Sequence, residues 1–391
     1  MKKICIFTST RADYGLLRPL MLEIRKSKEF KLSLIVSGTH LSRFHGHTID
    51  EIKKDGFFID DFVEMTLTSD SRSSIVKSIA MCSLGINDAL KKIKPDFLVI
   101  LGDRFEAFAA GFTAYTIGVR IIHIHGGEKT EGALDEAYRH SLTKFSDIHF
   151  VATEDYRKRV IQLGENPEYV FNVGALGIDN IKKEKFLNIV DFENQTGIKF
   201  GKRNVLFTYH PVTKIKEDSQ TILNNVFGVF LLKEFCDVNI IITMPNADPH
   251  NDEIRRKIID FSNRYPERVF VFENLGQKKY LSAMNLVDVV IGNSSSGIIE
   301  TPSFHIPTIN IGNRQKGRFF AESIIDVDES KEEFYNALVN AFDKKFINKC
   351  KKIKNPYGVG NTSQKIINIL KTFKNKKFIK EFYDIKELHF D

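Results

Sequence analysis

Short apolar runs alternate with segments of helical periodicity along the whole chain. The runs consist almost entirely of Ile, Val, Leu and Phe, which is typical of strands buried on both faces of a parallel sheet. They predict strands at 4–7, 32–36, 97–101, 121–124, 148–151, 205–208, 238–242, 269–272 and 287–291. Between them, apolar residues recur at helical spacing, as at Leu17, Leu20 and Ile24. This alternation predicts an α/β fold with doubly wound sheets.

The rhythm breaks near residues 177–203, where lysines and acids follow Gly177, and then restarts. A length of 391 residues agrees with two or three domains. We therefore predict two Rossmann-like domains, at 1–180 and 181–365, and a C-terminal helical tail at 366–391. The tail is rich in lysine but also carries Phe382 and Tyr383. We interpret it as an amphipathic cover rather than a nucleic-acid-binding arm.

Composition narrows the class of protein further. The net charge of +7 is spread over the whole length, whereas nucleic-acid binders usually concentrate basic charge on one face. No apolar run approaches the roughly 20 residues that span a bilayer. Four cysteines stand far apart, without Cys-x-x-Cys pairs or a neighbouring His cluster. We expect a soluble, cytoplasmic protein with no membrane or nucleic-acid partner and no metal site.

Candidate site residues are sought just after the strands, because open α/β sheets bind ligands beyond the carboxyl ends of their strands. Arg11 follows the first strand, where it could reach a diphosphate or simply pair with Asp13 at the surface. The turn lacks Gly-x-Gly-x-x-Gly, which argues against a nicotinamide cofactor. Asp103 follows strand 97–101 and is either the N-cap of a helix at 104–116 or an acid on the functional rim.

Further acids and a histidine gather at the same rim. In the turn His125–Glu128 two glycines permit an unusual backbone path. Of His123 and His125, we expect one to pack and the other to face the ligand, and we expect no metal pair. The next helix begins with two acids that can form ordinary i,i+4 pairs with Arg139 and His140. Together these residues form a plausible acid–base constellation: Asp103, His125, Glu128, Asp135 and Glu136.

The second half of the chain offers an anion site. His210 ends the strand 205–208, as either a structural residue or a ligand contact. A later strand runs into a turn of glycines and three serines, which offers backbone N–H groups and hydroxyls to a phosphate. The residues of this turn are Asn293, Ser294, Ser295, Ser296, Gly297 and Glu300. A loop at 312–319 has Walker-like glycine spacing but lacks the required Lys and Ser/Thr; its Arg314 and Arg318 could supplement the anion site.

Taken in series, these motifs resemble the hydrolysing UDP-N-acetylglucosamine 2-epimerases of bacterial sialic and legionaminic acid synthesis. The resemblance runs from the first strand to about residue 365. It rests on Thr10–Tyr14, Gly102–Arg104, His123–Glu128, Asp135–His140, His210–Pro211, Gly292–Gly297 and Arg314–Arg318. It implies a glycosyltransferase-B-like fold, with two Rossmann-like domains facing a cleft and a C-terminal helix crossing back. It also implies a homodimer or homotetramer, and neither a redox cofactor nor an obligatory metal.

The resemblance further implies elimination of UDP across C1 and C2 of the sugar, followed by addition of water with inversion at C2. Asp103 and Asp135 are then the best acid–base candidates, with Glu128 next and Glu136 beside them. Some relatives have an acid at the position of His125, which is therefore either an acid–base group or an orienting one. The nucleotide would be held by His210, by the serine turn from Asn293 to Glu300, and by Arg11 with Arg314 or Arg318.

Alternatives remain at this stage. The substrate is UDP-N-acetylglucosamine or a UDP-2,4-diacetamido-2,4,6-trideoxyhexose such as UDP-N,N'-diacetylbacillosamine. A non-hydrolysing epimerase, a glycosyltransferase of the same fold and a non-catalytic nucleotide-sugar-binding protein are the less favoured hypotheses. The cluster of acids argues against a pure binding protein, because an anionic ligand does not need them.

Overall fold

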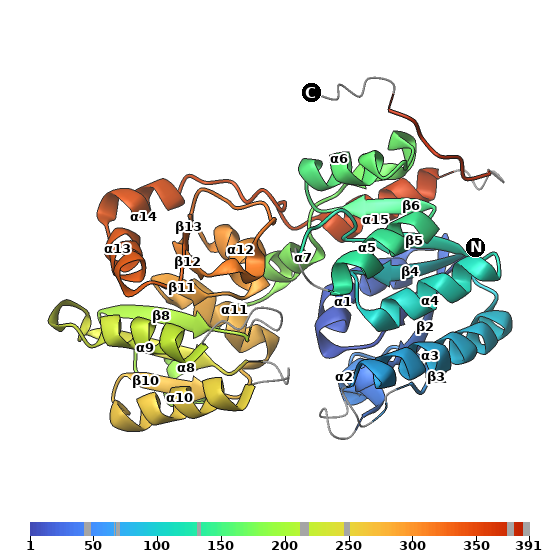
Figure 1. Ribbon diagram of the computed structural model, residues 1–391. Helices are drawn as coiled ribbons and strands as arrows, with labels where there is room; N and C mark the ends of the chain where they lie inside the picture. The colour runs from blue at the N-terminus through green and yellow to red at the C-terminus, as the bar shows by residue number, and fades with distance from the viewer. Residues whose placement is uncertain are drawn as a thin grey trace. The chain divides into compact units, whose positions relative to one another are not determined.

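The computed structural model describes residues 1–42, 48–65, 67, 71–130, 134–211, 219–245, 251–373 and 379–385. The chain divides into two compact units. Met1–Asn180 and the segment that begins at Tyr357 make up the first unit, and Ile181–Pro356 make up the second. In each unit, helices pack on a central sheet (Figure 1).

The first unit contains, over its described residues, a seven-stranded sheet in the order β3-β2-β1-β4-β5-β6-β7. Its strand pairs are parallel, and chain order reverses between β1 and β4, the topological switch point of the sheet. The strands are β1 (Lys2–Thr8), β2 (Phe30–Ser37), β3 (Asp61–Val63), β4 (Phe97–Leu101), β5 (Arg120–Ile124), β6 (Ile148–Val151) and β7 (Val170–Asn172).

Helices cover both faces of this sheet, as the apolar strand pattern predicts. Ile4 and Ile6 of β1 pack into one buried cluster, while Cys5 and Phe7 pack into another on the opposite face. The helices of this unit are α1 (Arg11–Lys26), α2 (Ile49–Lys54), α3 (Arg72–Ile93), α4 (Phe105–Thr116), α5 (Leu134–Phe145), α6 (Glu154–Gln162), α7 (Leu176–Lys183, which runs into the second unit) and α15 (Thr362–Thr372), with single 3-10 turns at Gly38–Leu41 and Pro167–Tyr169.

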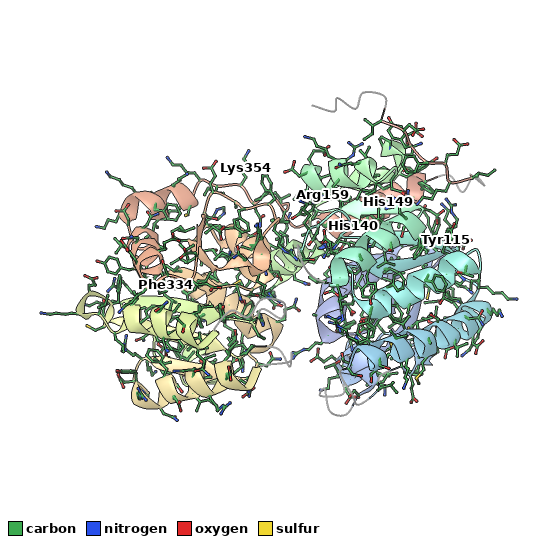
Figure 2. All side chains as sticks on the ribbon, in the orientation of Figure 1. Tyr115, His140, His149, Arg159, Phe334 and Lys354 are labelled. Carbon is green, nitrogen blue, oxygen red and sulfur yellow. The ribbon has the colours of Figure 1, made fainter. Side chains whose placement is uncertain are left out.

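The second unit repeats this topology with a six-stranded sheet, over its described residues, in the order β10-β9-β8-β11-β12-β13. Its switch point lies between β8 and β11. Phe334, labelled in Figure 2, is buried in its core. The strands are β8 (Arg203–Thr208), β9 (Val238–Thr243), β10 (Val269–Phe272), β11 (Val289–Gly292), β12 (Thr308–Ile311) and β13 (Ile324–Val327).

The helices of the second unit separate these strands along the chain. They are α8 (Ile189–Thr196), α9 (Ser219–Phe230), α10 (Asn251–Arg264), α11 (Gly276–Leu286), α12 (Ser295–Ile299), α13 (Lys331–Ala341) and α14 (Lys344–Cys350), with 3-10 turns at Lys233–Phe235, Thr301–Phe304 and Asn313–Gln315. The chain then returns to the first unit, where Ile366, Ile367 and Leu370 of α15 complete a buried cluster with residues of β1 and α1.

Lys380 anchors the last described segment, 379–385, to the first unit. Its ammonium donates to the carbonyls of Lys144 (2.7 Å) and Ser146 (2.5 Å), near the C-terminal end of α5, and pairs with Glu165 (2.7 Å). This segment is not helical, so the predicted helical tail is wrong for 379–385. The carbonyls at the C-terminal end of α5 have no partner within the helix and accept from Lys380 instead. This contact holds the segment in a non-helical path.

Glu165 is the buried acid at the centre of this anchor. It is 3% exposed and also accepts hydrogen bonds from Lys144 (2.6 Å) and His149 (2.9 Å), the latter labelled in Figure 2. Burial opposes ionisation, but the hydrogen bond and charge of His149, followed by the charge of Lys380, outweigh it. They lower the pKa of Glu165 from 4.5 to about 2. An ionised Glu165 therefore joins the segment 379–385, through Lys380, to the helix that carries Asp135 and Glu136.

We expect Lys380→Met to lower the free energy of unfolding by about 1–2 kcal/mol, because it removes a cation from several acceptors. Since the pKa of Glu165 is lowered from 4.5 to about 2, its contribution is fully present above pH 4.5 and is lost as the pH falls toward 2. The difference between variant and wild type should shrink in that window. Urea denaturation at several pH values measures it.

Lys371→Met is the matched control, because Lys371 forms a pair with the exposed Glu29 at 3.3 Å. Such a surface pair contributes about 0–1 kcal/mol. Equal destabilisation by the two variants at neutral pH would contradict the anchoring role of Lys380.

Candidate active site

The predicted site residues lie beyond the carboxyl ends of the central strands, where Rossmann sheets bind ligands. The first unit places them after β1 (Arg11), β4 (Asp103) and β5 (His125 and Glu128) and in the first turn of α5 (Asp135 and Glu136). The second unit places them after β8 (His210), from the end of β11 into α12 (Asn293 to Glu300) and after β12 (Arg314 and Arg318). Each group therefore adjoins or neighbours the switch point of its own sheet.

Asp103 is bound by a buried arginine. The guanidinium of Arg139, which is 1% exposed, donates to the Asp103 carboxylate through Nη2. Arg104, not Asp103, occupies the N-cap position of α4, and its side chain makes no capping hydrogen bond. The interpretation of Asp103 as a helix cap is therefore wrong. Its carboxylate turns instead to a buried cation, which is a stronger partner than a backbone N–H.

Arg139 also holds three other groups of this rim. It donates to Glu136 Oε2 (2.7 Å), to the Glu128 carbonyl (2.7 Å) and to Thr130 Oγ1 (2.8 Å). The acid of α5 that pairs with it is therefore Glu136, at i,i+3, and not Asp135 as predicted. The side chain is drawn inward because a buried guanidinium must satisfy its donors on the acceptors at the strand ends. The predicted pair of Glu136 with His140 forms at 3.0 Å.

The two acids at the start of α5 have different electrostatic surroundings. Burial, and then the charge of Asp103, raise the pKa of Asp135 from 3.8 to about 6. Burial acts on Glu136 in the same direction, but a hydrogen bond from the Thr130 backbone N–H and the charge of Arg139 outweigh it and lower its pKa. A carboxyl group with a pKa near 6 can both accept and release a proton close to neutral pH, as general acid–base catalysis requires.

The turn after β5 holds His125 against Glu128. His125 has a φ of 67°, a conformation that residues other than glycine rarely adopt, and its Nδ1 lies 3.0 Å from Glu128 Oε1. The backbone N–H of Leu176 donates to His125 Nε2 (3.5 Å). Nε2 therefore faces the Leu176 backbone, and Nδ1 is the ring nitrogen that lies beside Glu128. The strained backbone thus aims a histidine–carboxylate pair.

His123 is the packing histidine of the two. It is fully buried, its Nε2 donates to the Gly102 carbonyl (2.8 Å), and Thr143 lies 3.3 Å from its Nδ1. Burial lowers its pKa to about 3, so the ring is neutral and uncharged at the base of the rim. Residues two apart on a regular strand share a face, so the different surroundings of the two histidines arise because His125 lies beyond the end of β5, with a positive φ.

Arg11 does not pair with Asp13. Its Nε lies 3.0 Å from Glu51, and both side chains are about 40% exposed. Asp13 instead completes a capping box with Thr10 and accepts from the backbone of Ser9 (3.0 Å). The predicted surface pair is therefore wrong, because the cap of α1 occupies Asp13. An exposed ion pair is weak, so Arg11 is readily turned toward an anion.

His210 is held from behind by Asn293. The Asn293 side chain accepts from the His210 backbone N–H (2.7 Å) and donates to its carbonyl (2.8 Å). Arg314 (2.9 Å) and Gln315 (2.8 Å) in turn donate to the Asn293 carbonyl. Burial, and then the charge of Arg314, lower the pKa of His210 to about 3, so its ring is neutral. Asn293 is 0% exposed, and its role is to position the turn.

The three serines are half-buried and differ in their bonding. Ser294 caps α12 by accepting from the Ser296 N–H (3.4 Å), and the Ser296 hydroxyl donates to Glu300. Burial raises the pKa of Glu300, although the bond from Ser296 opposes it. Gly297 packs closely on β12, where Thr308 donates to its carbonyl (3.2 Å). The Arg318 N–H donates to the Gln315 carbonyl (3.2 Å) in the loop that carries Arg314.

Sequence reasoning missed three contributors to these rims. Arg139 appeared only as a helix-surface partner. Glu106, an acid 2% exposed within an apolar helix, is bound by Arg104 at 2.9 and 3.1 Å, and its position in that helix was the available signal. Tyr280 of α11 faces Ser294, Ser296 and Thr208, and burial raises its pKa. No local pattern connects Tyr280 to the serine turn.

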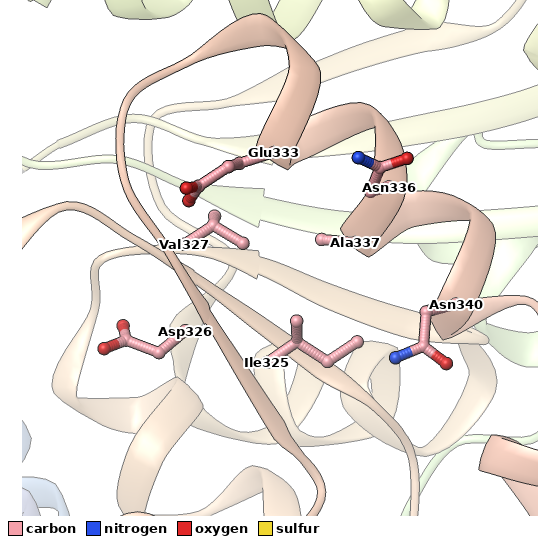
Figure 3. A pocket seen from close by; sticks show the side chains of 7 residues that line it. All are labelled: Ile325, Asp326, Val327, Glu333, Asn336, Ala337 and Asn340. Carbon is pink, nitrogen blue, oxygen red and sulfur yellow. The ribbon is translucent and has the colours of Figure 1, made fainter.

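The rest of the described chain offers no competing centre. Within the ranges given above, no group of three or more His, Cys, Asp or Glu side chains could hold a metal ion, and no helix is long and apolar enough to cross a membrane. A hollow of about 390 Å³ lies between β13 and α13 (Figure 3). Its acids serve local structure: Asp326 accepts from Asn310 (2.6 Å), and Glu333 accepts from the Asp328 N–H (2.9 Å).

Two Rossmann-type sheets, one with an acid-rich rim and one with a serine turn, define a class of two-domain α/β proteins whose strand ends are suited to binding ligands. The family model described as UDP-N-acetylglucosamine 2-epimerase matches residues 22–371. The chain therefore belongs to the UDP-N-acetylglucosamine 2-epimerase family, a family of enzymes, and the resemblance found in the motifs is confirmed.

Individual relatives agree with this assignment. The chain is 40% identical to a Campylobacter jejuni GDP/UDP-N,N'-diacetylbacillosamine 2-epimerase (hydrolyzing), with 88% of this chain and 87% of the relative covered. It is 37% identical to the Escherichia coli polysialic acid biosynthesis protein P7, covering 99% and 98%. The structure of the Neisseria meningitidis UDP-GlcNAc 2-epimerase bound to UDP-GlcNAc matches with a TM-score of 0.81 at 19% identity, covering 95% and 100%.

The predicted fold class is confirmed: α/β, with two Rossmann-like domains of the glycosyltransferase-B type. The cleft, the site residues and the homodimer or homotetramer stay predictions.

Proposed function

We propose that the chain is a hydrolysing 2-epimerase that converts UDP-N-acetylglucosamine and water to N-acetylmannosamine and UDP, for the synthesis of sialic-acid-type sugars. Family membership supports the substrate class, and the hydrolysing activity named for the Campylobacter jejuni relative supports the hydrolysing reaction. The observation that carries the chemistry is the unlike pair Asp103 and Asp135. One carboxylate is bound to a buried arginine, and the other has a pKa raised to about 6.

The reaction needs two proton transfers at carbon. In the first step the C2 proton leaves to a carboxylate, a double bond forms between C1 and C2, and the C1–O bond breaks with its electron pair going to UDP. In the second step a proton returns to C2 on the opposite face, and water adds to C1 and loses a proton. We assign these transfers to Asp103 and Asp135, with Glu128 as the next candidate. His125 orients Glu128, and Glu136 anchors the rim.

The nucleotide is assigned to the second unit. Ser295 and Ser296 offer hydroxyls beside His210, whose neutral ring can donate or accept a hydrogen bond without adding charge. Arg314 and Arg318 supply positive charge from the loop after β12, and Arg11 is the candidate cation after β1 of the first unit. Because α12 is only five residues long, its dipole adds little, and the hydroxyls and arginines carry the anion binding. Glu300 accepts from the ribose hydroxyls.

A second candidate substrate is UDP-N,N'-diacetylbacillosamine, with the same hydrolysing 2-epimerisation. It is favoured by the substrate named for the Campylobacter jejuni relative, which is 40% identical to this chain. The two substrates differ at C4 and C6 of the sugar, and the chemistry at C1 and C2 is the same. The assignments of Asp103 and Asp135 therefore hold for either one.

Side-by-side turnover of the two UDP sugars in heavy water tests the proposal. We expect release of UDP and of the free 2-epimerised sugar, with deuterium at C2, from one substrate at a much higher kcat/KM than from the other. Chromatography of the nucleotides and NMR of the sugars measure the products. Intact UDP-N-acetylmannosamine as sole product, or UDP release that requires a sugar acceptor, would overturn the hydrolysing reaction.

A further inference from the structure

We propose that Arg139 is the positioning residue of this site: its single buried guanidinium fixes Asp103 and Glu136 on the rim and leaves Asp135, on the same helix, free to carry the proton. The inference rests on the proposed function and adds to it a residue that divides the roles of the three acids.

Arg139 connects several elements of the first unit through its hydrogen bonds. Its acceptors are the Asp103 carboxylate after β4, the Glu128 carbonyl after β5, Thr130, and Glu136 on α5. Arg139 itself is 1% exposed, so these hydrogen bonds are shielded from bulk solvent. A planar guanidinium has five donors in a fixed fork and can hold these four acceptors at once, whereas a lysine ammonium has only three donors. The Arg139 guanidinium therefore fixes the positions of the segments after β4 and β5 relative to α5.

Asp135 is the acid at the start of α5 to which the Arg139 guanidinium does not donate. Within the described ranges it makes no hydrogen bond or ion pair, although it is half-buried. The charged groups that act on it come from each neighbouring element: Asp103 after β4, Arg104 and Glu106 at the start of α4, and Arg139 on α5. The two carboxylates raise the pKa of Asp135, and the two arginines lower it. A carboxyl without a fixed partner can turn to a substrate carbon.

Loss of Arg139 should therefore act on Asp135 in a particular direction. Without the guanidinium, Asp103 and Glu136 lose a buried cation beside Asp135, and one of the two arginine charges that lower the pKa of Asp135 is removed. The limb of the pH–rate profile that reports Asp135 should move to higher pH, whether Asp135 serves as base or as acid. Misplaced carboxylates should also lower kcat by about 10²-fold, since a displacement of about 1 Å has that effect in active sites.

The test compares Arg139→Met, Arg139→Lys and wild type in turnover of the preferred UDP sugar across pH. Arg139→Met should show the lower kcat and the displaced limb, with a smaller change in KM. Arg139→Lys restores the charge without the fork, so the limb should return toward its wild-type pH while kcat stays about 10-fold or more below wild type. Lysine at wild-type kcat, or a limb that does not move in Arg139→Met, would overturn the proposal.

Arg268→Met is the matched control. Arg268 is a buried arginine, 8% exposed, that donates to backbone carbonyls of the second unit, including that of Phe230 (3.1 Å). Its loss should lower stability and leave the pH profile unchanged. An equal shift of the limb in this variant would count against a specific role of Arg139.

A second readout does not depend on turnover. The carboxyl carbon of Asp135, labelled with ¹³C and assigned by its absence in Asp135→Asn, should titrate at higher pH in Arg139→Met than in the otherwise unchanged protein. Should Arg139→Met not fold, the same titration in Arg139→Lys, together with its kcat, decides the question. Absence of wild-type turnover would overturn the proposed function alone, while an unmoved ¹³C titration would overturn the positioning role alone.

Discussion

Asp135→Asn is expected to lower kcat by about 10²–10⁴-fold, the usual contribution of a general acid–base group. The substitution keeps the shape of the side chain and removes only its ability to exchange a proton. Because the pKa of Asp135 is raised to about 6, the wild-type pH–rate profile should bend near that pH. The bend should be absent from whatever activity the variant retains. Steady-state kinetics from about pH 5 to about pH 8, a range that contains the expected bend, measure both effects.

The same variant should be more stable than wild type at neutral pH. The pKa of Asp135 is raised from 3.8 to about 6 in the folded protein. Above pH 6 the ionised carboxylate therefore destabilises the folded state, and this destabilisation disappears as the pH falls and the folded protein takes up the proton. Asn carries no such cost, and we expect a gain of about 1–2 kcal/mol in the free energy of unfolding. Loss of activity together with a gain in stability separates a catalytic role from damage to the fold.

Asp155→Asn is the matched control for Asp135→Asn. Asp155 is an exposed acid in the first turn of α6, in the same unit. Its replacement should leave kcat and the pH profile close to wild type. A similar loss of activity in both variants, or wild-type kcat in Asp135→Asn, would remove Asp135 from the chemistry.

The strands that build the switch points could be predicted because they are buried on both faces and therefore almost purely apolar. The same pattern misses four strands at the outer parts of the sheets. In β12 (Thr308–Ile311) polar residues alternate with apolar ones, and the amide N–H of the buried Asn310 donates to Asp326 of the neighbouring strand β13. β3 (Asp61–Val63) and β7 (Val170–Asn172) are three residues long, too short for a periodicity to show. The edge strand β13 is only partly buried.

The location of the site could also be predicted, because the carboxyl ends of parallel strands share one edge of a sheet. The partners of the site residues could not. Asp103 and Arg139 lie 36 residues apart, and Tyr280 reaches the serine turn from another helix. Local rules propose the nearest partner on the same element, which is why Arg11 was paired with Asp13 and Arg139 with Asp135. In the buried rim of the first unit, Arg139 instead binds acceptors that are distant in sequence, because a buried guanidinium needs hydrogen-bond partners for its donors.

Gly292→Ala is expected to destabilise the second unit by about 4 kcal/mol or more, the range reached when strain and a core clash coincide. Gly292 ends β11 with a φ of 135°, and it pairs in register with Thr208 of β8. A Cβ at this position would collide with the Thr208 carbonyl oxygen and stand 2.7 Å from its carbon. The two strands that flank the switch point would have to separate, and the serine turn and His210 would move with them.

Thermal unfolding and titration with UDP measure the effect of Gly292→Ala, and Gly197→Ala is its control. Gly197 also has a positive φ, 75°, but nothing lies within 4 Å of a Cβ built there. Its substitution should cost about 1–2 kcal/mol, the price of the left-handed conformation alone, and should leave UDP binding intact. The difference between the two variants isolates the close approach of β11 to β8. Similar melting of the two, with UDP still bound by Gly292→Ala, would show that this close approach is not what shapes the nucleotide site.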